Sequence, residues 1–185
     1  MTPRYDKLLV LDLDETLIYA TRRPEAVSRT PEAEIDGYSV YRRPHLDSFL
    51  GAMFEWFRVG IWTSSGAGYA ADMIDWLGVG PQLEFMMSLP HCEPWFDPES
   101  ARWVASKPIA TLVRMGFAPA GILVVDDTPR KLRYDYTHLV PILPFTGQRH
   151  DEELKALLWF LESLGRETDV RPISKRGWRP HAEFE

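Results

Sequence analysis

The chain has 185 residues, of which 45% are hydrophobic, so it can bury one sizeable core and is most simply a single domain. Its net charge of −6 argues against a protein whose main role is to coat nucleic acid. The chain has a single cysteine, its start lacks the apolar region of a signal peptide, and no apolar run approaches the roughly 20 residues of a membrane span. We therefore expect a cytoplasmic protein, or a nuclear one in a eukaryote, with no membrane partner.

Short apolar runs alternate with stretches of helical periodicity along the chain. In chain order, the apolar runs that we expect to form strands are 8–13, 59–63, 84–88, 122–125 and 138–143. The stretches with helical spacing are 44–57, 69–77, 108–115 and 151–165. Residues 17–41 predict a β-flap, whereas residues 89–106, with three prolines, predict irregular chain. Strands separated by helices predict a three-layer, Rossmann-like α/β domain with a central parallel sheet.

Two of the predicted strands end on paired acidic residues. Asp12 and Asp14 stand at the end of the first strand, directly after the apolar residues 8–11, and Asp126 and Asp127 follow the strand 122–125. The carboxyl ends of parallel strands form the edge where α/β proteins bind ligands, and carboxylates crowded there repel one another unless a cation offsets them. Oxygen ligands suit Mg²⁺, and paired carboxylates can supply a nucleophile and an acid/base. The sequence therefore predicts a metal site at this edge, although the first pair alone is also consistent with a solvated turn.

Two further features are consistent with phosphate binding. The second predicted strand ends in Thr63-Ser64-Ser65-Gly66, whose hydroxyl and backbone N–H groups at a helix start can hold an anion. Taken alone, such a segment is more often an ordinary helix cap. Lys107 stands just before another predicted helix, where a cation opposes the helix dipole and an anionic partner would hold it. The alternative for this lysine is a solvated surface position.

In order and spacing, these residues resemble the four motifs of the haloacid dehalogenase superfamily. The matching segments are DLDETL at 12–17, the Thr63-Ser64-Ser65 strand end, Lys107 and VVDDTP at 124–129. The closer resemblance is to its RNA polymerase II C-terminal-domain phosphatases and small C-terminal-domain (nuclear LIM interactor-interacting factor-like) phosphatases. The segments that carry it are RRPHLDSFL at 42–50 and VPILPF at 140–145. The subgroup stays open, because Asp127 stands where the small phosphatases have asparagine.

The resemblance implies a magnesium-dependent phosphomonoester hydrolase that acts through an aspartyl-phosphate intermediate. In this reaction Asp12 is the nucleophile, and Asp14 is the general acid and then the general base. The Asp12 carboxylate, the Asp14 backbone carbonyl and Asp127 hold Mg²⁺, with Asp126 beside them. The residues expected to bind the transferring phosphoryl group are Thr63, Ser64 and Lys107.

The resemblance covers about residues 7–164, so we expect a phosphatase domain over 1–165 and a loosely held C-terminal extension over 166–185. The gaps between the motifs leave room for a small insert, about residues 84–106, and for no large cap. An open site admits a phosphorylated protein or peptide, which favours a protein serine/threonine phosphatase. The side chains expected to contact such a substrate are Arg43, Trp95, Phe96 and Trp103.

Several alternatives stay open. Arg43 can equally anchor the flap, and the three aromatic residues can equally cover the sheet edge. The same aromatics can stack on bases in a phosphatase of nucleic-acid ends, and small phosphorylated metabolites are a further alternative substrate. From another functional class, a catalytically silent module could bind a phosphorylated partner, but it would need neither Asp12 nor Asp14. The oligomeric state is also open.

Overall fold

A five-stranded parallel sheet forms the centre of the protein. The computed structural model describes residues 2–179 of the chain. The strands of the sheet, in spatial order, are β10 (Leu139–Pro141), β9 (Ile122–Asp126), β1 (Leu8–Leu11), β5 (Arg58–Trp62) and β6 (Phe85–Met87). All neighbouring strands run parallel. The predicted α/β fold with a central parallel sheet is therefore confirmed.

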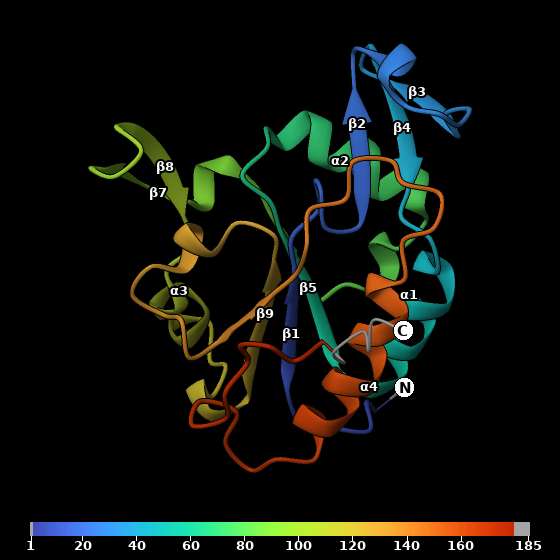
Figure 1. The fold of residues 1–185 in the computed structure, drawn as a ribbon. Helices are drawn as coiled ribbons and strands as arrows, with labels where there is room; N and C mark the ends of the chain where they lie inside the picture. Colours follow the sequence, from blue (N-terminus) through green and yellow to red (C-terminus); the bar gives the residue numbers. More distant parts are fainter. Residues whose placement is uncertain (1, 180–185) are drawn as a thin grey trace.

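Helices cover both faces of this sheet, as Figure 1 shows. The helices are α1 (Leu46–Trp56), α2 (Ala67–Leu77), α3 (Ile109–Arg114) and α4 (Glu153–Gly165). Leu9 and Leu11 of β1 pack in one core with residues of α1, α2 and α4, whereas Leu8 and Val10 pack in a second core with residues of α3. Successive residues of a strand point to opposite faces. Because both faces are covered, the strand is apolar at every position.

Two glycines serve the packing of these elements. The helix α2 ends at Gly78, which has the left-handed φ of 70° that favours glycine at a helix end. A Cβ atom at Gly60 in β5 would lie 2.4 Å from the ring of Phe85 in β6, so a larger residue would displace that ring. None of the helices within residues 2–179 has the length and apolar character needed to cross a membrane.

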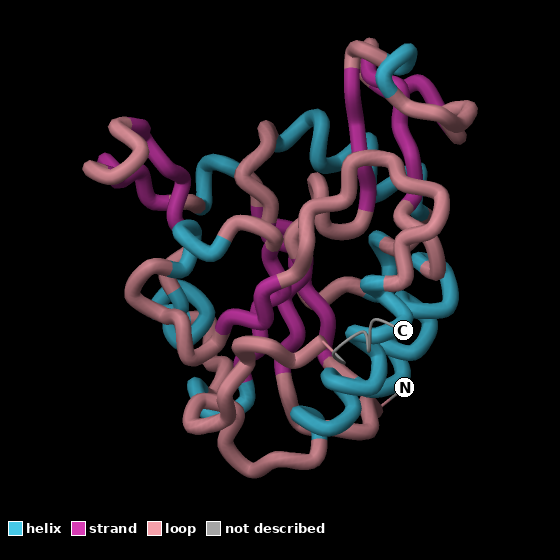
Figure 2. Tube along the Cα trace, viewed as in Figure 1, coloured by secondary structure: helices cyan, strands magenta, loops and turns pink. Residues whose placement is uncertain are grey.

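Two small antiparallel sheets stand at the same end of the molecule, on either side of it (Figure 1, Figure 2). The first is the predicted flap, in which β4 (Tyr38–Arg42) lies between β2 (Ile18–Thr21) and β3 (Ala33–Ile35). The second is a hairpin of β7 (Glu93–Asp97) and β8 (Arg102–Ser106). The prediction of irregular chain over 89–106 was therefore wrong, because cross-strand pairing of aromatic and β-branched side chains outweighs the three prolines.

The segment that follows α4 packs against the rest of the chain. Lys175 is buried, and its ammonium group donates hydrogen bonds to three backbone carbonyl oxygens. The ring of Trp178 stacks on Phe160 of α4 at a centroid distance of 5.5 Å. The expectation of a loosely held extension was therefore wrong for residues 166–179, and residues 180–185 lie outside the described part. The boundary between domain and extension stays a prediction.

Candidate active site

The topology of the sheet brings the two acidic strand ends together. The strands β1 and β9 are neighbours, and the order of the sheet reverses between them. Leu11 pairs with Val125, so Asp12 and Asp126 follow side by side, and the Asp12 amide donates to the Val125 carbonyl at 3.0 Å. Ligands of open α/β sheets bind at such a switch point, outside the carboxyl ends of the strands.

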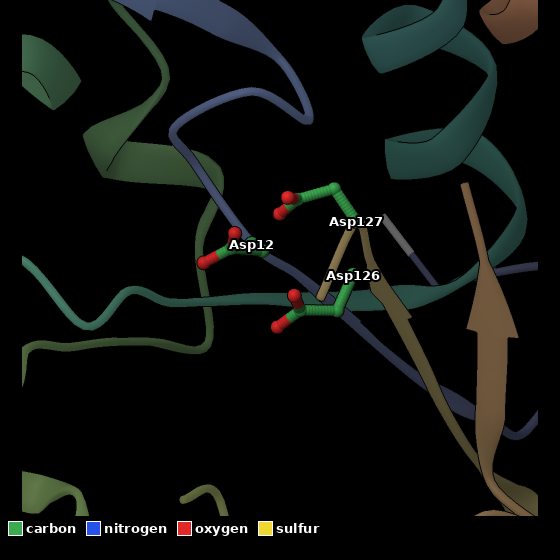
Figure 3. Close-up of side chains that lie close together, drawn as sticks. All are labelled: Asp12, Asp126 and Asp127. Carbon is green, nitrogen blue, oxygen red and sulfur yellow. The ribbon is translucent and has the colours of Figure 1, made fainter. Parts of the chain in front are cut away.

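Three carboxylates form a cluster at this point. Asp12, Asp126 and Asp127 each contribute an oxygen atom within 4.8 Å of the other two, and their side chains extend to the same side in Figure 3. Asp12 and Asp126 are almost completely buried. Three negative charges so close together repel one another strongly where water is excluded. A set of clustered oxygen donors of this kind fits a hard divalent cation such as Mg²⁺.

Two lysines offset part of the charge of this cluster. The Lys107 Nζ atom lies 2.7 Å from Asp12 Oδ1 and 2.6 Å from Asp126 Oδ2. The Lys131 Nζ atom lies 3.0 Å from Asp12 Oδ2 and 3.1 Å from Asp126 Oδ1. It is also 3.8 Å from Asp127 Oδ1. Each lysine therefore contacts one oxygen of Asp12 and one of Asp126, and the two lysines use different oxygens.

Hydroxyl groups surround the Asp14 carboxylate. The Ser65 hydroxyl donates to Asp14 Oδ2 at 2.7 Å, and the Tyr69 hydroxyl donates to Asp14 Oδ1. The Thr63 hydroxyl is 3.4 Å from Asp14 Oδ2 and accepts a hydrogen bond from the Ser65 amide at 3.0 Å. The roles of Thr63, Ser64 and Lys107 as phosphate ligands stay predictions.

The two aspartates of the first motif have opposite pKa shifts. Burial by itself raises the pKa of Asp12, but the ammonium groups of Lys107 and Lys131 together outweigh it and hold the pKa below its usual value. Burial raises the pKa of Asp14, although two hydroxyl groups donate to its carboxylate. Burial also raises the pKa of Asp127 to about 7, against the opposing charge of Lys131. The two shifts make Asp12 the stronger acid of the pair and Asp14 the weaker one, which is the division that a nucleophile and a general acid need.

Arg43 is engaged within the protein. Its side chain is completely buried, and its Nε and Nη2 atoms each donate to a different oxygen of Asp151 at 2.8 Å. Its remaining donors reach the backbone carbonyl oxygens of Thr16 and Leu143 at 3.1 and 2.8 Å. These contacts correspond to the anchoring alternative, because a buried guanidinium with its donors satisfied is not available to a substrate.

The three aromatic residues of the insert do not form one cluster. Phe96 and Trp103 pair edge to face and are 49% and 72% exposed. Trp95 points to the opposite face of the hairpin, where the Arg133 guanidinium lies 3.8 Å from the centre of its ring. On that face Trp95 lines a groove of about 810 Å³ that also includes Asp127. Of the three aromatic side chains expected to contact a substrate, only Trp95 therefore lines this groove, and their substrate contacts stay predictions.

Three residues of this site are missing from the sequence prediction: Lys131, Ser65 and Tyr69. Ser65 lies inside the predicted phosphate-binding segment, and Lys131 follows Asp127 by four positions, so both carried a weak local signal. Tyr69 lies in the helical pattern of α2, where an aromatic residue is normally part of the core. Tyr69 can be recognised as a residue of the site only from the fold, which places its hydroxyl group against Asp14.

Comparisons with known proteins agree with this geometry. The family model described as NLI interacting factor-like phosphatase matches residues 7–171. The chain belongs to this family. It is 32% identical over 178 residues to the CTD small phosphatase-like protein of Homo sapiens, across 92% of this chain and 60% of the relative. It is 31% identical over 180 residues to the Homo sapiens carboxy-terminal domain RNA polymerase II polypeptide A small phosphatase 1, across 92% and 64%.

This NLI interacting factor-like chain therefore spans less than two thirds of the length of these two relatives. Among solved structures it resembles that of Fcp1, described as an essential RNA polymerase II CTD phosphatase. The TM-score is 0.56 at 18% identity, over 89% of this chain and 51% of the other. At that identity the likeness concerns the fold alone. Recognition of the haloacid dehalogenase superfamily and of its C-terminal-domain phosphatase branch is confirmed.

Proposed function

We propose that the protein is a magnesium-dependent phosphomonoester hydrolase that acts through an aspartyl-phosphate intermediate. The observation that carries this proposal is the carboxylate cluster at the ends of β1 and β9, with Lys107 on Asp12 and the hydroxyl groups around Asp14. The lowered pKa of Asp12 and the raised pKa of Asp14 agree with it. An ionised carboxylate can attack phosphorus, and a protonated one can supply the proton that the leaving oxygen requires. The two functions therefore fall on different members of one short motif.

The reaction has two steps. In the first, a carboxylate oxygen of Asp12 forms a bond to phosphorus, the bond from phosphorus to the ester oxygen breaks, and that oxygen takes the proton of Asp14. In the second, the Asp14 carboxylate takes a proton from a water molecule, which attacks phosphorus and releases inorganic phosphate and free Asp12. Lys107, Thr63 and Ser64 bind the phosphoryl oxygens, because phosphoryl transfer is accelerated mainly by positioning and charge neutralisation.

The residues that would hold the metal are Asp12, Asp127 and the backbone carbonyl of Asp14, with Asp126 beside them. When bound there, Mg²⁺ supplies positive charge next to the transferring phosphoryl group. The carboxylate cluster supports this assignment, since its oxygen donors converge and two lysines alone leave it with net negative charge.

We infer that the substrate is a phosphoserine or phosphothreonine in a polypeptide. The groove beside Asp127 extends to Trp95, and an open groove cannot enclose most of the surface of a small metabolite. Acidic residues outnumber the two arginines, Arg130 and Arg133, in its lining, which disfavours a polyanionic nucleic acid. The acidic lining residues are Glu15, Asp97, Glu99 and Asp127. The relatives named as C-terminal-domain phosphatases support the same substrate class.

The test compares kcat/KM for phosphoserine and phosphothreonine peptides, a sugar phosphate, a mononucleotide and DNA carrying a terminal phosphate. We expect the peptides to be preferred, and Asp12→Asn to be inactive while its circular dichroism spectrum is unchanged. A preference for DNA ends that falls steeply with salt favours the nucleic-acid alternative. Phosphopeptide binding without turnover of any substrate favours the silent binding module. A cytoplasmic location, or a nuclear one in a eukaryote, stays a prediction from the cysteine content.

A further inference from the structure

Lys131 contacts every member of the carboxylate cluster. Its Nζ atom is 3.0 Å from Asp12, 3.1 Å from Asp126 and 3.8 Å from Asp127. The same three residues are the ones whose oxygen atoms converge within 4.8 Å. The Lys131 ammonium group, with one positive charge, therefore contacts the same carboxylates that would bind a divalent cation.

On Asp12 and Asp127, the oxygen atoms that Lys131 contacts are the ones that the other partners leave over, whereas on Asp126 it shares Oδ1 with the Thr128 amide. Lys107 takes Asp12 Oδ1 at 2.7 Å, and the Thr128 hydroxyl takes Asp127 Oδ2 at 2.9 Å. Lys131 lies against Asp12 Oδ2 and Asp127 Oδ1. These are the oxygens of the two carboxylates that a metal can bind without sharing an atom with the Lys107 and Thr128 contacts. Lys131 and the metal therefore compete for the same atoms.

The side chain of Lys131 reaches solvent, whereas its backbone is held in place. The Lys107 amide donates to the Lys131 carbonyl at 2.8 Å, and Leu132 beside it is buried in the core. The side chain of Lys131 is nevertheless 12% exposed, while that of Lys107 is completely buried. A lysine has four flexible side-chain bonds, so Nζ can turn toward solvent while the backbone stays fixed.

A divalent cation and an ammonium group cannot share these oxygens at low free-energy cost. Both are positively charged, and their repulsion is strong over a few ångströms in a cleft with little water. We propose that Lys131 is a built-in competitor of the metal: it neutralises the carboxylate cluster in the metal-free protein and is displaced when Mg²⁺ binds. This inference rests on the proposed metal-dependent function. It implies a higher Mg²⁺ requirement than the carboxylates alone would give, because the metal binds only the molecules whose cluster is free.

The test is the Mg²⁺ affinity of metal-stripped protein, measured by calorimetry without substrate. Lys131→Met removes the charge and keeps the length of the side chain, and we expect it to lower the Mg²⁺ Kd by about 10-fold. Arg130→Met is the matched control, since it removes the same charge from the preceding residue. The Arg130 side chain is 50% exposed and its ion-pair partner is Asp97, at 3.5 Å. We expect this variant to keep the wild-type Kd.

Thermal unfolding supplies a second measurement. In chelator, Lys131→Met should have a lower Tm than the wild type, because Asp12 and Asp126 keep only Lys107 as an ammonium partner and Asp127 keeps none. Added Mg²⁺ should then raise the Tm of the variant more than that of the wild type, as expected for a ligand that binds the folded state more tightly. Lys131→Gln, which retains a hydrogen-bond donor without charge, repeats both measurements if the methionine variant folds poorly.

The outcomes separate this inference from the proposed function. Equal or weaker Mg²⁺ binding in both Lys131 variants, with Mg²⁺-dependent hydrolysis by the wild type, would overturn the competitor role and leave the proposed function standing. A similar gain of affinity in Arg130→Met would also overturn it, because the effect would then come from net charge. No Mg²⁺ binding by any of the proteins, together with no Mg²⁺-dependent hydrolysis, would overturn both.

Discussion

Arg43 and Asp151 form a bidentate ion pair across 108 positions of the chain, with both N–O distances at 2.8 Å. The arginine side chain is completely buried and the aspartate is 12% exposed. Asp151 also accepts a hydrogen bond from the Glu153 amide at 3.1 Å, in the first turn of α4. This single pair therefore joins the end of the flap to the start of the last helix.

We expect Arg43→Met to lower the free energy of unfolding by about 3 kcal/mol or more, because it leaves the Asp151 charge poorly solvated and unpaired. Arg166→Met is the control, since its side chain is 63% exposed and pairs with Glu162 at the surface. Its cost should stay below about 1 kcal/mol, as for surface ion pairs. Urea unfolding measures both variants. A loss for Arg43→Met no larger than that of the control would contradict the anchoring role.

Asp14→Asn and Asp127→Ala should separate acid/base chemistry from metal binding. We expect Asp14→Asn to slow turnover by about 10²–10⁴-fold, because the side chain supplies the proton while only its backbone carbonyl is assigned to the metal. Its Mg²⁺ affinity should stay close to that of the wild type. Asp127→Ala should weaken Mg²⁺ binding in calorimetry. Equal loss of binding in the two variants would show that this division of roles is wrong.

The Tyr69 hydroxyl donates a hydrogen bond to Asp14, and we expect it to orient that carboxyl group. Tyr69→Phe should slow turnover of a phosphoserine peptide by about 10-fold, the equivalent of one hydrogen bond of about 1.4 kcal/mol. Turnover of p-nitrophenyl phosphate should fall less, because its leaving group departs without a proton. Tyr38→Phe is the control, since Tyr38 packs edge to face on Tyr69 at 5.7 Å. Equal losses on the two substrates would indicate a purely structural role.

The two tryptophans of the hairpin should differ in their effect on substrate binding. Trp95→Ala should raise KM for a phosphopeptide far more than KM for p-nitrophenyl phosphate, because Trp95 lines the groove beside Asp127. Trp103→Ala changes the opposite face of the hairpin and should leave both KM values nearly unchanged. Steady-state kinetics on both substrates provide the measurement. Similar increases for the two variants would mean that the groove does not hold the peptide.

His138 makes folding stability depend on pH. Burial lowers the pKa of His138, and the positive charges of Lys175 and Arg171 lower it further. The hydrogen bond with the Ile122 carbonyl at 3.0 Å and the charge of Asp135 oppose this shift without cancelling it. The unfolded state therefore gains its proton first as the pH falls. Stability that is complete above about pH 6.5 is lost as the pH falls toward the folded-state pKa.

Urea unfolding at about pH 7.5 and about pH 5.5 tests this dependence in the wild type and in His138→Gln. The wild type should lose more stability between the two values than the variant, because glutamine cannot take up a proton. The carboxylates of the protein contribute equally to both proteins and cancel in the comparison. An identical loss in both would exclude His138 as a source of the dependence.

The strands and the acidic strand ends could be predicted because their signals are local. The runs 8–11 and 122–125 are apolar at every position since helices cover both faces of the sheet, and the acidic residues follow them directly along the chain. The end of α2 at Gly78 is equally local, because it depends on the backbone freedom of that one residue.

Contacts between distant positions were decided by the tertiary structure alone. Lys131 meets Asp12 across 119 positions, and several other basic residues of the chain offered the same charge. Which of them reaches the cluster depends on the path of the chain after β9. The separation of Trp95 from Trp103 depends on the register of β7 against β8, since alternate residues of a strand point to opposite faces. Residue type determines what a side chain can bind, whereas only the folded backbone determines what lies within its reach.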